Sequence, residues 1–290
     1  MPEADLIANV MITGLLTGMV YGLMALGLSV VFGVVRIVNF AHGELMTAAM
    51  YTVVLLSSAT QLDPLWLMIP MGVLFFGLGY GLQRTVINRF IQRPEHSQLL
   101  LMLAIATILV NGLLMGFGPD AQSVQTDYQL DSFELGPLLL DKPRVYAATA
   151  AALTALALLA YFRYTTTGKA IRACADNHMG ALVTGLPLKH LYALTFGLGT
   201  ACVAIAGCAQ MLLLDVTPAA GPAYTLLAFV IVIVGGLGSM AGALFGGVLI
   251  GMSEALAGLF VAPSAKSMFS FALLILILLV RPAGLLGARA

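Results

Sequence analysis

Charged residues are what this sequence lacks most. The chain of 290 residues has thirteen basic and thirteen acidic side chains, 9% of the total, whereas a soluble domain has about 25%. Apolar residues make up 60% of the sequence and the mean hydropathy is +1.01. Such a composition predicts an integral membrane protein, because a surface this apolar is not stable in water. The net charge is zero, so nothing indicates a nucleic-acid partner or an acidic substrate.

Cysteine is also scarce. Cys174, Cys202 and Cys208 are odd in number and lack the spacing of a metal site, so we expect free, buried thiols and no bound metal. A secretory signal is not expected, because Glu3 and Asp5 stand where such a signal has basic residues. The first apolar segment is therefore predicted to stay in the membrane as a helix.

The uncharged stretches between charges indicate the membrane spans. A helix needs about 20 apolar residues to cross the hydrocarbon layer. Four stretches of 18 to 24 uncharged residues fit one crossing each, at 64–83, 97–119, 145–162 and 191–214. A shorter run at 267–280 adds another.

Two uncharged stretches are too long for one crossing. Residues 216–253 contain Pro218, Pro222 and the sequence "GGLGSMAG", which predict a short helix near 223–235, a glycine break, and a helix near 241–257. For residues 6–35, either that stretch or the segment after it is expected to hold a break. The predicted fold is an all-α polytopic membrane bundle of eight or nine transmembrane helices, in one domain over residues 1–290.

Basic residues suggest the orientation. They cluster in the loops 84–93 and 163–189 and at Arg281 and Arg289, whereas the loop 119–142 has five acids and one lysine. Since cytoplasmic loops are enriched in Lys and Arg, we expect both basic loops and the C-terminus in the cytoplasm. The loop 119–142 then faces the periplasm, and the side of the N-terminus stays open.

Glycines at four-residue spacing predict close helix packing. They occur at Gly14, Gly18 and Gly22, at Gly77 and Gly81, and at Gly242–Gly246 and Gly247–Gly251.

Two interruptions, "NFAHGE" at 39–44 and "GGLGS" at 235–239, each precede a helix rich in small residues. Corresponding breaks in two halves of a transporter indicate an inverted-repeat-like arrangement with a solute path between them. The candidate path residues are Asn39, His42, Glu44, Gly236, Gly238 and Ser239.

The polar cluster Asn39, His42 and Glu44 allows other interpretations. It could lie at the level of the lipid headgroups, pair with Arg36 and cap the next helix. It could also serve an intramembrane enzyme, although His42 and Glu44 have no nucleophile or metal spacing beside them. Glu254 is interpreted as a residue near the outer end of the 241–257 helix. "GGLGSMAG" lacks the Lys-Ser/Thr of a phosphate loop, so this chain is not expected to bind ATP.

The segment 166–190 carries a helical apolar pattern. Ile171, Ala175, Met179, Leu182 and Leu186 recur at three- or four-residue spacing, which predicts one short amphipathic helix that ends near Gly185–Pro187. The helix could lie on the membrane surface or dock into the groove of a soluble partner.

Three long blocks resemble a known family. They are "GLMALGLSVVFGVVRIVNFAHGELMTAAMY", "GKAIRACADNHMGALVTGLPLKHLYALTFGLGTACVAIAG" and "AFVIVIVGGLGSMAGALFGGVLIGMSEAL", followed by a terminal "RPAGLLG". They are similar to the LivH-type permease subunits of bacterial branched-chain amino acid ABC importers, from about Leu15 to Gly287. Members of this group also import urea, short amides or aromatic acids.

The resemblance implies a multi-pass subunit of the bacterial inner membrane that moves branched-chain or other neutral amino acids inward by alternating access. It implies a second, related permease, two cytoplasmic ATP-binding subunits and a periplasmic solute-binding protein, with ATP bound by the partners and no cofactor in this chain. Segment 164–190 would couple to the ATP-binding subunits. Its candidate residues are Gly168, Ala170, Arg172, Ala175, Asp176, Gly180, Leu182 and Gly185.

Overall fold

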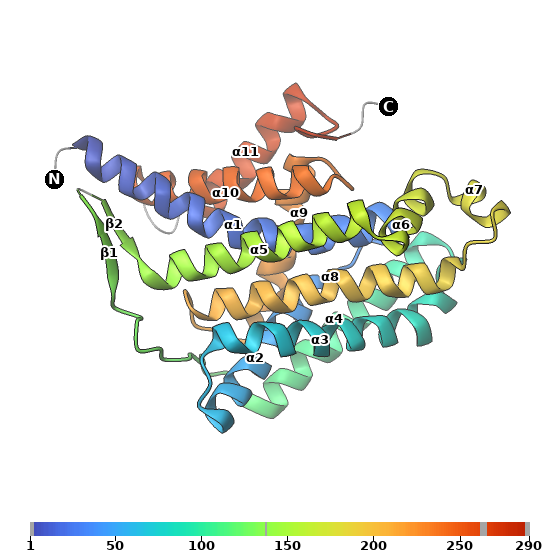
Figure 1. Cartoon of the computed structure of the whole chain (residues 1–290), viewed down its shortest axis with the longest axis horizontal. Coiled ribbons are helices and arrows are strands. Elements are labelled where there is room, and N and C mark those ends of the chain that lie inside the picture. The colour runs from blue at the N-terminus through green and yellow to red at the C-terminus, as the bar shows by residue number, and fades with distance from the viewer. Residues whose placement is uncertain (1–2, 137, 262–265, 288–290) are drawn as a thin grey trace.

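The computed structural model describes residues 3–136, 138–261 and 266–287, which form a helical bundle with one small hairpin (Figure 1). The longer helices are α1 (Glu3–Val35), α2 (His42–Thr60), α3 (Pro64–Thr85), α4 (Glu95–Phe117), α5 (Lys142–Tyr164), α8 (Leu188–Met211), α9 (Gly221–Gly235), α10 (Met240–Phe260) and α11 (Lys266–Val280). The shorter elements are η1 (Ile87–Arg89), β1 (Ser132–Leu135), β2 (Leu138–Asp141), α6 (Thr166–Asp176), α7 (His178–Val183) and η2 (Pro218–Ala220).

The all-α polytopic fold is confirmed. Within the described residues, seven helical segments are long and apolar enough to cross a membrane: α1, α3 to α5, α8, α9 and α10, with the neighbouring 3-10 turn counted in two of them. The 19-residue α2 and the 15-residue α11 are not among these seven, so fewer helices meet the requirement than the eight or nine predicted. The antiparallel hairpin β1–β2, in the loop 119–142, was not predicted.

The bundle has two chemically different ends. One end, called the acidic end here, carries the loop 118–141 with the hairpin, and the N-terminus lies beside it because the Leu139 amide donates to Asn9 Oδ1 (3.0 Å). The opposite end, called the basic end, carries α6, α7 and the arginines of the α3–α4 link (Figure 1).

The first long apolar stretch forms one helix. α1 has 33 residues, about 50 Å at the α-helical rise, and it contains no break. The interruption follows it, at residues 36–41. Arg36 has a φ of +58°, a left-handed conformation typical of the residue after a helix. Of the two positions that the sequence allowed for the break, the structure selects the later one.

The second long stretch divides as predicted, into α9, a break at 236–239, and α10. Gly236 and Gly238 have φ of +110° and +79°, values that glycine adopts without the steric cost of a side chain. The C-terminal segment covers this break: the amides of Leu285 and Leu286 donate to Val234 O and Gly235 O, both at 2.9 Å.

The glycine ridges of α1 and α10 pack against each other. A β-carbon placed on Gly18 would lie 2.7 Å from the Val248 backbone, and one on Gly247 would overlap Gly22. Helix backbones this close gain the packing contacts that hold membrane helices together. The ridge predicted at Gly77 and Gly81 is wrong, because a β-carbon on either would meet no atom of the described residues within 4 Å.

The other pair of spaced glycines in α10 packs closely against a neighbouring helix, as the spacing predicted, and the cysteines are also as predicted. Gly242 and Gly246 contact Gly235 and Ile231 of α9, so one face of α10 packs on α1 and another on α9. The three cysteines are free and buried, as predicted.

Candidate functional site

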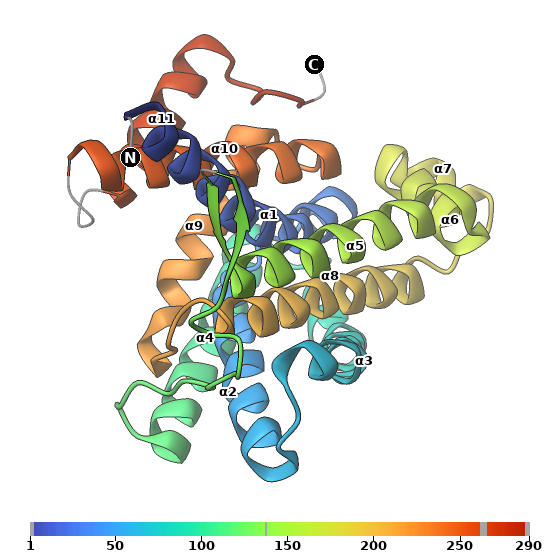
Figure 2. The same ribbon diagram turned by 60° about the vertical axis from the view of Figure 1, so that its left-hand side comes forward.

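α2 begins inside the bundle. His42, its first residue, is 1% exposed and places Nε2 2.9 Å from the carbonyl oxygen of Met24. Met24 lies eleven residues before the end of α1, about 16 Å along the helix. From there α2 runs toward the acidic end. Along it the Tyr51 ring contacts that of Phe117 in a tilted arrangement, and the Tyr51 hydroxyl donates to Val216 O. Figure 2 shows α2 and α9 steeply inclined to α5 and α8.

α9 begins at the same place. The Gly43 amide donates to Thr225 Oγ1 (2.9 Å), and the Thr225 hydroxyl donates to Glu44 Oε2 (2.9 Å). A side chain on Gly43 would overlap the backbone of Gly221 and Thr225. We call residues 39–44 together with 221–225 the junction. Here the N-termini of two helices meet at one carboxylate, which their positive dipole ends stabilise.

The three candidate path residues of the first interruption are all buried in the junction. Asn39 is 0% exposed and Glu44 3%. Asn39 Oδ1 accepts from the Ala41 amide, while Asn39 Nδ2 has no hydrogen-bond partner among the described residues. This placement differs from the headgroup interpretation. Ion pairs within the described residues join Lys142 to Asp131 and Arg144 to Asp141, and none involves Arg36.

The candidate path residues of the second interruption lie at the basic end. Gly238 and Ser239 line a groove of about 1,210 Å³, together with Arg36 of the first interruption and with Ala175 and Asp176 of α6. Gly236 does not line it, because Gly284 and Gly287 pack against it. The groove, called the basic-end groove below, therefore joins both interruptions to the predicted coupling segment.

The coupling segment forms two helices rather than the single one predicted. Asn177 has an extended backbone and its side chain accepts from the Gly180 amide, so it ends α6 and caps α7. Ile171 of the predicted apolar face is buried, whereas Met179 and Leu182 are 68% and 49% exposed.

The other coupling candidates divide by burial. Gly168 is buried against the end of α5. Three residues are half-buried: Ala170, Ala175 and Gly180. Four are exposed: Arg172, Asp176, Leu182 and Gly185.

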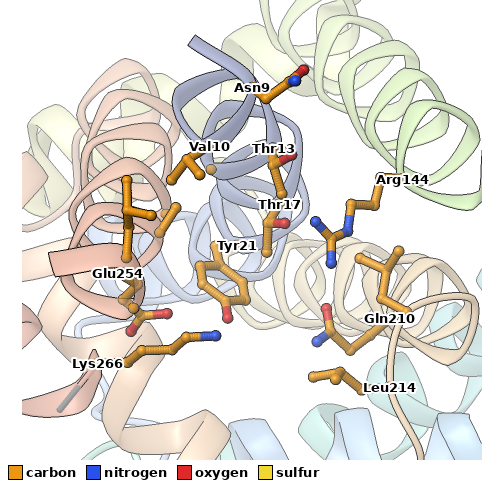
Figure 3. A pocket seen from close by; sticks show the side chains of 16 residues that line it. Asn9, Val10, Thr13, Thr17, Tyr21, Arg144, Gln210, Leu214, Glu254 and Lys266 are labelled. Carbon is orange, nitrogen blue, oxygen red and sulfur yellow. The ribbon is translucent and has the colours of Figure 1, made fainter. Parts of the chain in front are cut away.

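A cavity that was not predicted from the sequence lies near the acidic end. It has a volume of about 470 Å³ and lies between α1, α5, α8, α10 and α11. Figure 3 shows its polar lining, in which Tyr21 stands between Glu254 and Gln210 and the Arg144 guanidinium points inward. We call it the outer cavity. Two polar residues inside predicted spans, Gln210 and Glu254, were the sequence signal for it.

Comparison with known proteins identifies the family. A family model described as "branched-chain amino acid transport system / permease component" matches residues 10–278. The chain belongs to this permease family. It is 31% identical to the high-affinity branched-chain amino acid transport permease protein LivH of Salmonella typhimurium, over 96% of this chain and 94% of that protein. LivH of Escherichia coli K12 gives the same figures.

More distant proteins agree. The permease protein BraD of Pseudomonas aeruginosa is 26% identical over 99% of this chain and 98% of that protein. PsaBC from Streptococcus pneumoniae, solved with a Fab, shares the fold with a TM-score of 0.52 at 15% identity, over 95% of this chain and 92% of that one. The chain is thus a multi-pass membrane component of a transport system, and the intramembrane-enzyme alternative with His42 and Glu44 is not favoured.

Proposed function

We propose that this permease is a membrane subunit of an ABC importer that moves branched-chain amino acids into the cell by ATP-driven alternating access. The observation that carries the proposal is the junction, where α2 and α9 start inside the bundle with their N-termini facing each other. Helices that start at mid-depth are typical of transporters, because a path can open beside their ends. The names of the relatives supply the solute class.

The proposed location is the bacterial inner membrane, with the whole chain as one permease domain. Lys and Arg favour the cytoplasm, so the basic end faces inward and the loop 119–142 faces the periplasm. α1 then runs inward from a periplasmic N-terminus. The C-terminal segment is cytoplasmic, because it bonds to the break at the basic end.

The proposed partners are a second, related permease in a heterodimer, two cytoplasmic ATP-binding subunits and a periplasmic solute-binding protein. ATP binds to the partners, and this chain has no ATPase activity or cofactor of its own. The segment 164–190 is the coupling segment, with Met179 and Leu182 of α7 as the exposed apolar contacts.

The basic-end groove supports a route for coupling. A shift of α7 moves α6, and Ala175 and Asp176 of α6 face Gly238 and Arg36 across the groove. Gly238 lies in the link between α9 and α10, and Arg36 lies in the link between α1 and α2. Closure of the ATP-binding subunits would therefore act on both interruptions together. ATP drives transport only if it changes which face of the path is exposed.

A matched pair of Leu→Asp variants tests the coupling role. Leu182→Asp should abolish co-purification of the ATP-binding subunits, because it places a charge at an apolar contact. Leu130→Asp, at a 99% exposed position of the acidic end, should leave co-purification unchanged. Intact assembly of the Leu182→Asp complex would contradict docking through α7.

A ligand screen tests the solute class. The partner binding protein should be stabilised in a thermal-shift assay by leucine, isoleucine and valine, and proteoliposomes with the full importer should take up leucine with ATP. Stabilisation by urea, a short amide or an aromatic acid instead would replace the branched-chain amino acids as the solute.

A further inference from the structure

The outer cavity holds opposite charges that do not neutralise each other. Arg144 uses Nε for an ion pair with Asp141 (3.2 Å), and Figure 3 shows its guanidinium directed into the cavity. Glu254 accepts from Ser270 Oγ through Oε1 (2.7 Å), and its carboxylate also lies beside the Tyr21 hydroxyl. Within the described residues, Arg144 and Glu254 form no ion pair with each other.

A buried amide lies in the same cavity. Gln210 is 1% exposed, and neither its amide nitrogen nor its amide oxygen makes a hydrogen bond of good geometry, although the Tyr224 hydroxyl is near. Buried polar groups normally have partners, since an unpaired one costs free energy. The amide points into the cavity (Figure 3), where a ligand would complete its bonding.

The cavity also has an apolar part. Val10, Leu213, Leu214 and Leu259 contribute to its wall. Its volume of about 470 Å³ falls within the range of about 300–1,000 Å³ for small-molecule sites. Tyr21 lies next to Glu254 on the polar side, and Lys266 stands at the exposed rim.

Building on the proposed function, we propose that the outer cavity is a subsite of the permease that binds the zwitterionic backbone of an aliphatic amino acid. The Arg144 guanidinium and the Gln210 amide bind the α-carboxylate, a group that guanidinium recognises with paired hydrogen bonds. Glu254 and the Tyr21 hydroxyl bind the α-ammonium group. The aliphatic side chain lies against the leucines and Val10. The cavity is near the acidic end, where a periplasmic binding protein would release its ligand.

Protection of an introduced cysteine tests this subsite. Thr17 lines the cavity, and the native cysteines are buried, so Thr17→Cys gives a thiol that a membrane-impermeant maleimide can report on with little background. The complex of permeases and ATP-binding subunits is labelled in nanodiscs without the binding protein. Leucine should slow labelling. Isopentylamine lacks the carboxylate and 4-methylpentanoate lacks the ammonium group, so each should protect about 10- to 100-fold less well.

Two variants separate ligand binding from folding. Arg144→Gln in the Thr17→Cys background should remove protection by leucine while the labelling rate without ligand and the elution profile stay unchanged. Asp141→Asn breaks the ion pair of Arg144 but keeps its guanidinium, so protection should persist. The subsite would be overturned if Asp141→Asn lost protection by leucine while Arg144→Gln kept it. Equal protection by leucine and isopentylamine would also overturn it.

The subsite and the proposed function fail in different ways. If leucine enters proteoliposomes that carry the binding protein but does not protect Cys at position 17, the subsite is wrong and the importer function stands. If leucine protects the thiol but no leucine is imported, the subsite stands and the proposed function is wrong.

Discussion

The junction and the outer cavity each place a carboxylate within the helical bundle, but they use it differently. Glu44 is 3% exposed and accepts from Thr225, next to the backbone of Gly43 and Gly221. Glu254 is half-buried beside open volume, where it accepts from Ser270 and lies next to the Tyr21 hydroxyl. An acid in a membrane helix is therefore not by itself a solute site. What distinguishes the two is whether the fold has already supplied the carboxylate's partners.

The electrostatic surroundings explain the difference. At the junction two helix N-termini face Glu44, and no cationic side chain is needed because the helix dipoles offset the charge. In the outer cavity the positive charges belong to Arg144 and, at the exposed rim, Lys266, both on different helices from Glu254. Junction residues are thus expected to determine stability, and cavity residues to determine binding.

The largest effect is expected from glycine substitutions in the two regions. Gly43→Ala should destabilise the folded permease by about 3 kcal/mol, since overpacking against backbone cannot relax easily. Gly258→Ala in the cavity wall would meet only the flexible Lys266 side chain and should change stability by less than about 0.5 kcal/mol. Thermal unfolding in detergent measures the stability of both variants. Equal losses of stability would contradict the proposed difference between the junction and the outer cavity.

The next largest difference is expected between alanine variants of the two carboxylates, Glu44 and Glu254. Glu44→Ala leaves the Thr225 hydroxyl without its acceptor and removes the carboxylate beside two helix N-termini, so it should cost about 2 kcal/mol of stability along with transport. Glu254→Ala should keep most of the stability while uptake of leucine falls. Unfolding curves and uptake are measured on the same preparations. If the Glu44→Ala permease were as stable as wild type but had lost uptake, the result would indicate that the solute path runs through the junction.

A third hydroxyl–carboxylate pair gives the smallest effect, because it lies outside the membrane spans. The Tyr128 hydroxyl donates to Asp63 Oδ1 (2.9 Å), and Tyr128→Phe should cost about 1 kcal/mol. Burial, together with this carboxylate, raises the pKa of Tyr128 above its usual value of about 10.

The raised pKa of Tyr128 predicts a pH dependence. The folded protein holds the phenolic proton more tightly than the unfolded chain does, so the bond contributes fully below about pH 10 and is lost as the pH rises further. The stability difference between wild type and Tyr128→Phe should therefore shrink above that pH. A difference that grew with pH would contradict the assignment.

Local patterns predicted much of the architecture. The break at 236–239 followed from glycine and proline positions, and the α1–α10 contact agrees with glycines at four-residue spacing. The same spacing failed at Gly77 and Gly81, where Gly79 contacts Thr200 instead, because spacing does not say which face of a helix meets a neighbour. Asn177 divided the predicted coupling helix, because its side chain forms a cap that competes with continuous helix.

The outer cavity could not be predicted, since its walls come from five helices that are far apart in the sequence. Likewise, "NFAHGE" identified a polar interruption but not its depth, which is set by the bond from His42 to Met24.

The sequence by itself determined that this protein is a multi-pass helical membrane protein with two interruptions, because hydropathy, charge and glycine spacing act locally along the chain, and its resemblance to a known family indicated a permease. Only the tertiary structure decided which polar residues are bound to each other and which line open space. That depends on how helices distant in the sequence pack, and packing brought Glu44 to Thr225 but left Glu254 facing a cavity.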